Sequence, residues 1–245
     1  MLAFRSLLFN VFFYVWLAVI LVAMMAALPF PRRLMQNAVR VWAWVTQWGL
    51  EIIVGLDYRV VGLDRLPPGP VILASKHQSA WDTHVYHLLF ADAAYVMKKE
   101  LLKIPLWGWV ARKCQSVVVD RSGGGAALKQ MVRDCRKALT DGRPLVIFPE
   151  GTRSKPGDHH PYFPGVYAIY ARGGAPVVPV ALNSGVFWGR RDFKKYPGTI
   201  TIEFLDPMPA GLGRKEFLGQ LEERIESASR RLVEAAQKEL AEKSG

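Results

Sequence analysis

The pattern of apolar and polar residues changes once along the chain, near Gly55, and divides it into two parts. Residues 6–28 contain no charged side chain, and Leu, Val, Phe and Ala dominate them. About 20 helical residues, at ~1.5 Å rise each, suffice to cross a ~30 Å hydrocarbon layer. The stretch exceeds the ~7–15-residue apolar core of a secretory signal peptide, so it predicts an uncleaved membrane helix.

A second apolar segment, residues 37–54, has a mixed character. It carries Trp42, Trp44 and Trp48 together with Arg40 and Glu51. Tryptophans near a basic cluster are typical of a helix in or near the lipid headgroup layer, and a buried helix of the following domain is the alternative. The two segments could also enter one leaflet together as a hairpin.

Basic residues flank the first segment unequally. Arg5 precedes it, whereas Arg32, Arg33 and Arg40 follow it. The positive-inside bias therefore predicts that the C-terminal domain lies on the cytoplasmic side. The membrane we expect is the inner membrane of the cell.

Beyond Gly55, short apolar runs rich in Val and Ile alternate with stretches of helical pattern. Several runs are continuously apolar, which is expected where both faces of a sheet are covered. The expected strands are residues 58–62, 71–75, 94–98, 116–120, 145–148, 177–181 and 199–204, and the expected helices are residues 81–90, 125–140, 166–172 and 214–243. This alternation predicts an α/β fold with a largely parallel sheet flanked by helices, preceded by an N-terminal hydrophobic membrane helix or two-helix hairpin. The predicted domains are a membrane anchor at residues 1–55 and a main domain at residues 56–245.

Charge and cysteine content refine this picture. The chain is 51% hydrophobic, unlike a disordered chain, and its formal net charge of +11 implies anionic partners such as lipid, phosphorylated substrates or nucleic acid. Its two cysteines, Cys114 and Cys135, lie in no CxxC pair, so neither a disulfide framework nor a cysteine-based zinc site is expected.

The first stretch suited to chemistry is SKHQSAWDT, at residues 75–83, directly after an apolar strand. Imidazole can take a proton from a hydroxyl near pH 7, and a nearby carboxylate fixes its tautomer and stabilises the imidazolium. Five steps of about 100° would put His77 and Asp82 on different faces of one helix, so we expect His77 before the helix and Asp82 in its first turn. An ordinary strand–helix loop is the alternative.

The second stretch is FPEGTRS, at residues 148–154, which follows another strand. Ligands bind at strand ends in α/β sheets. Gly151 lets the backbone approach a ligand closely, and Thr152 and backbone amides can donate hydrogen bonds to a phosphate. Arg153 can clamp the phosphate with two parallel hydrogen bonds, and a plain turn with Arg153 in solvent is the alternative.

Two further strands carry comparable signals. Residues 117–121, VVVDR, would deliver Arg121 as a second phosphate ligand, with a surface ion pair between Asp120 and Arg121 as the alternative. Residues 178–180, VPV, form a strand with an internal proline, which fits an edge position or a bulge beside a site, or else core packing.

Together the four stretches resemble the signature blocks of the glycerolipid acyltransferase family, and they are most similar to those of bacterial 1-acyl-sn-glycerol-3-phosphate acyltransferases. The family pattern is His-x4-Asp, an Arg block, Phe-Pro-Glu-Gly-Thr-Arg-Ser and a Val-Pro block, in this order, and the match spans residues 71–183. The third block matches without a gap, and a lipophilic N-terminal segment is also typical. One departure is Lys76, where many members carry Asn; it could alter substrate preference but leaves the His77/Asp82 pair intact.

The resemblance implies a role for each residue. His77 would deprotonate the 2-hydroxyl of 1-acyl-sn-glycerol 3-phosphate (lysophosphatidic acid), which attacks an acyl thioester, and Asp82 would orient His77. The acceptor site would be shaped by Arg121, Glu150, Gly151, Thr152 and Arg153, with the two arginines facing the phosphate. The donor would be acyl-CoA or acyl carrier protein and the product phosphatidic acid, made at membrane lipid without nucleic acid, metal or other cofactor.

Other classes of protein fit the sequence less well. It has neither the Gly-x-Ser-x-Gly elbow of serine hydrolases nor a P-loop. A metal site of His77, Asp82, His84 and His87 is conceivable, because His84 and His87 share a helical face. Two alternatives stay open: the same chemistry on another lyso-lipid, such as a lyso-aminolipid without phosphate, and a non-catalytic membrane module that binds anionic lipid or nucleic acid.

Overall fold

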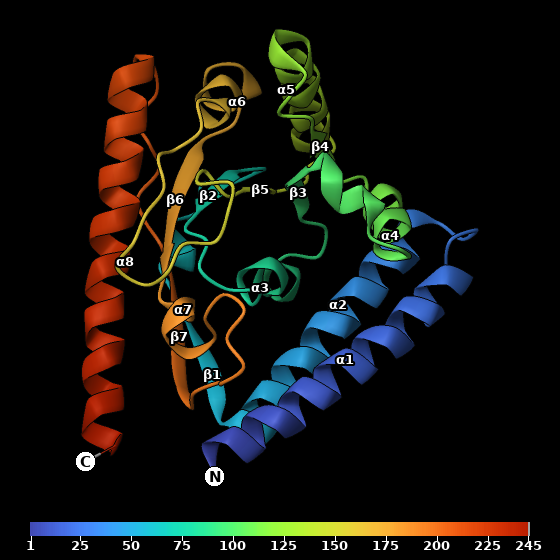
Figure 1. The fold of residues 1–245 in the computed structure, drawn as a ribbon. Helices are drawn as coiled ribbons and strands as arrows, with labels where there is room; N and C mark the ends of the chain where they lie inside the picture. Colours follow the sequence, from blue (N-terminus) through green and yellow to red (C-terminus); the bar gives the residue numbers. More distant parts are fainter. Residues whose placement is uncertain (245) are drawn as a thin grey trace.

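The computed structural model describes residues 1–244, and its N-terminal part is a pair of long helices. Helix α1 spans Leu2–Ala26 and α2 spans Arg32–Gly49, and the two run back along each other as a hairpin (Figure 1). A π-helical turn, Leu50–Val54, extends α2 to Gly55, where a left-handed φ of 79° ends it. The tryptophan-rich segment is therefore helical, as predicted, and its helix begins at Arg32 rather than at residue 37.

Both helices of the hairpin have one buried and one exposed face. In the described part of the chain, α1 alone is long and apolar enough to cross a membrane. Phe9 of α1 is fully buried, whereas Val15 is 59% exposed. Trp42 of α2 is buried, whereas Trp44 and Trp48 are exposed. The buried face of α2 fits a helix packed on the domain, and the exposed tryptophans are available to a headgroup layer.

The rest of the chain forms one seven-stranded sheet with the strand order β1-β7-β6-β2-β5-β3-β4. Its strands are β1 (Leu56–Val61), β2 (Ile72–Ser75), β3 (Ala94–Lys98), β4 (Val117–Val119), β5 (Leu145–Ile147), β6 (Val177–Leu182) and β7 (Gly198–Phe204). Neighbouring strands are parallel except for β6 and β7, which are antiparallel. The predicted, largely parallel sheet is confirmed, and every expected strand lies within two residues of an observed one.

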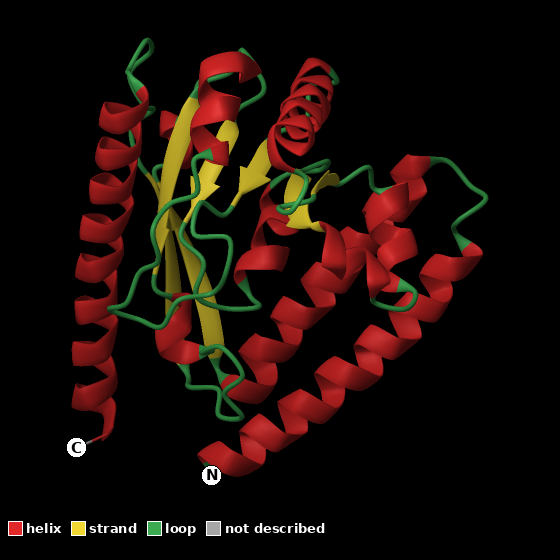
Figure 2. Cartoon of the chain, turned by 45° about the horizontal axis from the view of Figure 1, so that its top comes forward, coloured by secondary structure: helices red, strands yellow, loops and turns green. Residues whose placement is uncertain are grey.

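Helices cover both faces of this sheet (Figures 1 and 2). Ile72 and Ala74 of β2 face a core shared with α5 (Gly124–Thr140), α6 (Gly165–Gly173) and α8 (Arg214–Ser244). Leu73, on the opposite face, shares a core with α3 (Asp82–Leu89) and with Phe9 of α1. Successive residues of a strand point to opposite faces, so the continuously apolar strands follow from burial on both sides.

Two short helices were not expected from the sequence: α4 (Trp107–Lys113) and α7 (Ser184–Phe187). Val110 of α4 is buried in a cluster with Met35 and Val39 of α2. Gly108 approaches the backbone of Leu102 so closely that an added Cβ would lie 2.1 Å from its carbonyl oxygen. Tertiary packing rather than local periodicity therefore defines α4.

The position of Pro179 corrects one sequence interpretation. An edge strand was considered, but β6 lies inside the sheet between β7 and β2, so the edge position is wrong. The ladder with β7 begins at Val180, so the missing N–H of Pro179 falls at the end of that ladder. Pro179 is buried, which confirms core packing as its role.

The burial of Phe9 generates a prediction about the hairpin. We expect Phe9→Ala to lower the free energy of unfolding by roughly 3–5 kcal/mol, because α1 then leaves a cavity in the main core. Thermal or denaturant unfolding of the full chain in a mild detergent measures this change. Val15→Ala is the matched control and should change little; equal effects of the two substitutions would contradict a hairpin packed on the domain.

Candidate active site

The strand order brings four chemically important chain segments to one edge of the sheet. Strands β2, β5, β3 and β4 are parallel neighbours, so their carboxyl ends lie side by side. His77 follows β2, residues 148–154 follow β5, Lys98 ends β3 and Arg121 follows β4. Such an edge is the common ligand-binding position in α/β sheets.

His77 and Asp82 form a tight pair at this edge. Nδ1 of His77 lies 3.0 Å from Oδ2 of Asp82, and the same oxygen accepts the backbone N–H groups of Gln78 (2.6 Å) and Ser79 (2.8 Å). The hydroxyl of Ser184, at the start of α7, donates to Oδ1 (2.5 Å). His77 precedes α3 and Asp82 is the first residue of this helix, as predicted. With Asp82 ionised, Nδ1 carries the proton and Nε2 is left as the basic nitrogen.

The 148–154 segment holds the main chain of His77 on both sides. Oε1 of Glu150 accepts the His77 N–H (3.3 Å). The His77 carbonyl accepts the backbone N–H of Ser154 (2.9 Å) and the Ser154 hydroxyl (3.3 Å). The ring of Phe148 stacks on the imidazole, with centroids 4.0 Å apart. Glu150 and Ser154 thus fix the backbone of the histidine.

Lys76 takes part in a buried ion cluster behind His77. Its side chain is 1% exposed, and Nζ lies 3.2 Å from Glu150 and 2.8 Å from Glu226 of α8. Nζ also donates to the Asp158 carbonyl (3.1 Å), and the Tyr162 hydroxyl donates to Glu226 (2.8 Å). Lys76 therefore connects the 148–154 segment to the last helix, on the side away from the cavity described next.

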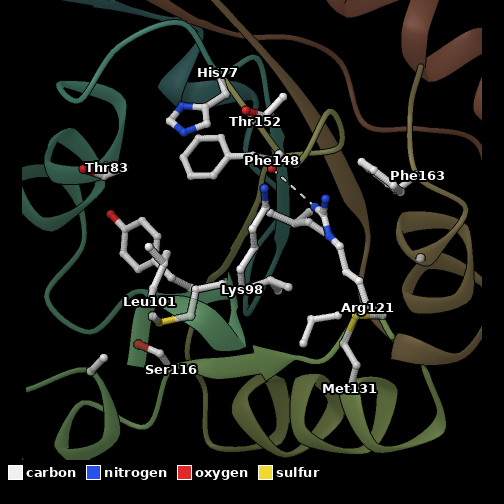
Figure 3. A pocket seen from close by; sticks show the side chains of 18 of the residues that line it. His77, Thr83, Lys98, Leu101, Ser116, Arg121, Met131, Phe148, Thr152 and Phe163 are labelled. Atoms are coloured by element: carbon white, nitrogen blue, oxygen red, sulfur yellow. Dashed lines mark hydrogen bonds between the residues drawn. The ribbon is translucent and has the colours of Figure 1, made fainter. Parts of the chain in front are cut away.

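A cavity of about 520 Å³ opens beside His77 and has two chemically different ends. Figure 3 shows His77, Phe148 and Thr152 together, with the side chains of Lys98 and Arg121 reaching towards them. The polar end also includes Arg153 and Arg190. The apolar end is lined by residues of α2, β3, the 3-10 turn Lys99–Lys103, α4 and α5, among them Val39, Met97, Leu101, Val110, Leu128 and Met131. This division suits a ligand with an anionic group at one end and a hydrocarbon chain at the other.

The cations at the polar end are crowded together. Burial lowers the pKa of Lys98, and the nearby Arg121 lowers it further. Burial also lowers the pKa of Arg153, with Arg190 as the next cause. Repulsion between like charges is relieved when an anion binds among them.

Gly151 serves the placement of Arg121. A Cβ at Gly151, where φ is 61°, would lie 1.7 Å from Nη2 of Arg121. The guanidinium stacks 4.0 Å above the Phe163 ring, and Nη2 donates to the Gly151 carbonyl (3.4 Å). The glycine thus makes room for a protein side chain rather than for a ligand. A second, smaller cavity of about 450 Å³ lies beyond Arg121.

The structure gathers most of the predicted site residues around the first cavity. His77, Arg121, Gly151, Thr152 and Arg153 line it directly, and Asp82 supports His77 from behind. The Glu150 carboxylate faces Lys76 and the backbone instead, where it also accepts the N–H of His160 (3.1 Å). The sequence analysis missed Lys98, Ser184 and Arg190; for Lys98, its place at a strand end was an available signal.

The four residues of the conceivable metal site are not brought together. In residues 1–244, no three His, Cys, Asp or Glu side chains form a group that could hold a metal ion. The His84 ring lies among Trp42, Trp81 and Trp188, at centroid distances of 5.6, 5.9 and 6.2 Å. Burial lowers the pKa of His84 to about 3 and that of His87 to about 4, so both are neutral near pH 7.

These depressed pKa values predict acid sensitivity. An unfolded histidine binds a proton below about pH 6.5, whereas the native His84 stays neutral, so stability is present above this pH and falls as the pH decreases. Between about pH 6.5 and 5, we expect His84→Phe to lose roughly 2 kcal/mol less stability than wild type, because phenylalanine does not titrate. A phenylalanine ring can pack among the three tryptophans that surround His84. Denaturant midpoints measured at several pH values in this range give the change of stability with pH. His159→Phe, at an exposed position, is the control. Identical slopes for His84→Phe and wild type would contradict a neutral, buried His84.

Comparisons with known proteins concern the family and the fold of the chain. A model of the acyltransferase family matches residues 57–183. A 1-acyl-sn-glycerol-3-phosphate acyltransferase of Pseudomonas aeruginosa is 34% identical over 200 residues, which cover 82% of this chain and 77% of that protein. A yeast enzyme of the same name is 27% identical over 180 residues, 72% of this chain and 59% of its own.

A solved structure supports the fold. The crystal structure of the 1-acyl-sn-glycerophosphate acyltransferase from Thermotoga maritima has a TM-score of 0.75 and covers 95% of this chain and 98% of its own. At 22% identity, this likeness concerns the fold alone. Because the family model and the Pseudomonas relative each cover more than half of the sequence, the chain belongs to the acyltransferase family.

Proposed function

We propose that this acyltransferase moves a fatty acyl group from acyl-CoA or acyl carrier protein to the sn-2 hydroxyl of 1-acyl-sn-glycerol 3-phosphate. The observation that carries the proposal is the His77/Asp82 pair beside a cavity with crowded cations at one end and apolar side chains at the other. Lysophosphatidic acid has a phosphate and an acyl chain on one glycerol, which matches both ends. The names of the Pseudomonas and yeast relatives point to the same acceptor.

The mechanism follows from the free nitrogen of His77. Nε2 takes the proton of the 2-hydroxyl as its oxygen attacks the thioester carbonyl carbon. The resulting imidazolium is stabilised by the Asp82 carboxylate, which Ser184 and two backbone N–H groups hold in place. When the tetrahedral intermediate collapses, the C–S bond breaks and His77 returns the proton to the leaving thiolate. The products are phosphatidic acid and the free thiol of the donor.

The phosphate would sit among the cations opposite His77. Arg121 and Arg153 are the sequence-predicted ligands, and Lys98 enters the same space from β3 (Figure 3). Guanidinium groups can bind a phosphate through two parallel hydrogen bonds, and an ammonium group adds a compact charge. Thr152, which borders both cavities, is placed to donate a further hydrogen bond.

The hairpin would hold the enzyme at the cytoplasmic surface of the membrane. Near its start, α1 is bonded to the domain by Ser6, whose Oγ accepts the N–H of Lys195 (3.0 Å). At the other end, Arg32 of α2 pairs with Asp92 of the domain (2.6 Å). Because both ends of α1 lie close to such attachments, we infer that the hairpin enters one leaflet by its exposed face rather than crossing the bilayer.

Acyl transfer by the full chain in a mild detergent tests the proposal. Wild type should form phosphatidic acid from lysophosphatidic acid with acyl-CoA, with acyl carrier protein, or with both. His77→Ala should lower kcat by roughly 10²–10⁴-fold because the general base is lost. The variant should stay folded, with a somewhat lower unfolding temperature, because Asp82 loses one hydrogen-bond donor and keeps three. His159→Ala, on an exposed loop, is the matched control and should retain turnover.

Three other outcomes would redirect the assignment. Full activity of a folded His77→Ala protein would reject the general-base mechanism. Transfer only to a lyso-aminolipid would assign a different acceptor. No transfer to any lyso-lipid would favour the non-catalytic, lipid-binding alternative.

Glu150 and Arg153 should separate in their kinetic effects. We expect Arg153→Gln to raise the KM for lysophosphatidic acid by roughly 10–100-fold, because a charged hydrogen bond to the phosphate is lost. Glu150→Gln should instead lower kcat by roughly ten-fold or more at nearly unchanged KM, because it loosens the backbone of His77. Steady-state kinetics on the folded variants measure both values. A raised KM with normal kcat in Glu150→Gln would restore Glu150 as an acceptor ligand.

A further inference from the structure

A basic loop between α7 and β7 lies beside the start of α1. This basic loop, residues 190–195, reads RRDFKK and so carries four cations and one carboxylate. Arg190, Arg191 and Lys194 are exposed, and Phe193 is 52% exposed between them. The mechanism proposed above uses neither Arg191, Phe193 nor Lys194.

The basic loop has a defined conformation. Lys195 is 2% exposed, and its Nζ donates to the carbonyls of Asp192 (2.7 Å) and Phe193 (3.0 Å). Burial lowers the pKa of this ammonium group to about 8. Arg191 has a left-handed φ of 63°, which is uncommon for a residue other than glycine. Internal bonds of Lys195 thus shape the loop, and Arg191 and Lys194 are exposed to solvent.

Two polar side chains of the largely apolar α1 bind this loop. Oγ of Ser6 accepts the N–H of Lys195 (3.0 Å), and Nδ2 of Asn10 donates to the Phe193 carbonyl (3.1 Å). Ser6 and Asn10 are four residues apart and therefore share one side of the helix. These bonds fix the loop alongside the first three turns of α1.

The exposed apolar stripe of α1 runs next to the loop. Leu7, Val11 and Tyr14 are 50%, 53% and 66% exposed and recur at helical spacing. At about 100° per residue, this stripe lies between the side that binds the basic loop and the opposite side, where Phe12 contacts Trp48 of α2 (6.4 Å between centroids). If the stripe is seated in a leaflet, the basic loop is at the level of the headgroups.

We propose that Arg191, Phe193 and Lys194 form a contact for anionic phospholipid headgroups, beside the mouth of the active-site cavity. The charge of the loop is complementary to an anionic bilayer surface, and Phe193 supplies an aromatic ring suited to the interface. Arg190 links this contact to the site, because it lines the cavity and donates to the Arg153 carbonyl (3.2 Å). The inference rests on the proposed work of the enzyme at a bilayer.

Partition of the full chain between two vesicle populations tests the contact. Protein is diluted from detergent into a mixture of phosphatidylcholine vesicles and denser vesicles that contain phosphatidylglycerol, and the two are separated by density. Each basic residue near an anionic surface contributes roughly a five-fold preference, so the variant Arg191→Asn/Lys194→Gln should lose roughly 25-fold of the preference for phosphatidylglycerol. Asparagine is chosen for position 191 because it tolerates the left-handed backbone.

The matched control removes two cations elsewhere. Arg214→Gln/Lys215→Gln acts at the start of α8, far from α1 (Figure 1), and should keep the preference of wild type. High salt should abolish the difference between wild type and the loop variant, because the contact is exposed. Equal partition of wild type and the loop variant at low salt would overturn the proposal.

The binding measurement stands apart from catalysis. If wild type shows no acyl transfer but the loop variant loses the preference for phosphatidylglycerol, the proposed function is rejected and the lipid contact is kept. If wild type transfers acyl groups but both proteins partition equally, the lipid contact is rejected and the proposed function is kept. If the loop variant partitions normally but loses turnover with acyl carrier protein and not with acyl-CoA, the loop binds a protein donor instead, and the lipid contact is rejected.

Discussion

The buried carboxylate of Asp82 is the interaction on which the site depends. Its two oxygens accept hydrogen bonds from the His77 ring, from the backbone N–H groups of Gln78 and Ser79, and from the hydroxyl of Ser184. A carboxylate without such donors is costly to bury, so the loop after β2 is stable only when it supplies them. The same bonds select the His77 tautomer that leaves Nε2 basic. Packing of Trp81 on the hairpin, through its bond to Gln47 (2.8 Å), joins this loop to the N-terminal helices.

Around this carboxylate, neighbouring residues of one segment have separate tasks. In the 148–154 segment, Glu150 and Ser154 grip the backbone of His77, while Thr152 and Arg153 face the cavity. Gly151 has no side chain and so leaves room for the guanidinium of Arg121. A contiguous motif thus both supports the proposed base and forms part of the cavity wall, because its successive side chains point in different directions.

Much of this was predictable, because buried parallel strands have continuous apolar runs and their ends carry the polar residues. Helical geometry predicted that His77 precedes a helix and that Asp82 lies in its first turn, and the pairing of the two was expected from the resemblance to the acyltransferase family. Contacts between distant segments could not be predicted: Ser184 reaches Asp82 across 102 residues, and the direction of Glu150 depends on Lys76. The strand order, which sets β3 between β5 and β4 and so brings Lys98 to the site, is equally a property of the whole sheet.

The ion pair between Lys76 and Glu226 also affects the order in which parts of the chain can fold during synthesis. The two residues are 150 positions apart, so on the ribosome Lys76 emerges long before its partner. At about 5–20 residues per second, the interval is roughly 8–30 s. During this interval the apolar hairpin has already been synthesised, whereas Lys76, which positions Glu150 beside His77, still lacks its partner Glu226. A nascent chain would therefore reach the lipid surface first and become competent for chemistry only when the last helix has docked.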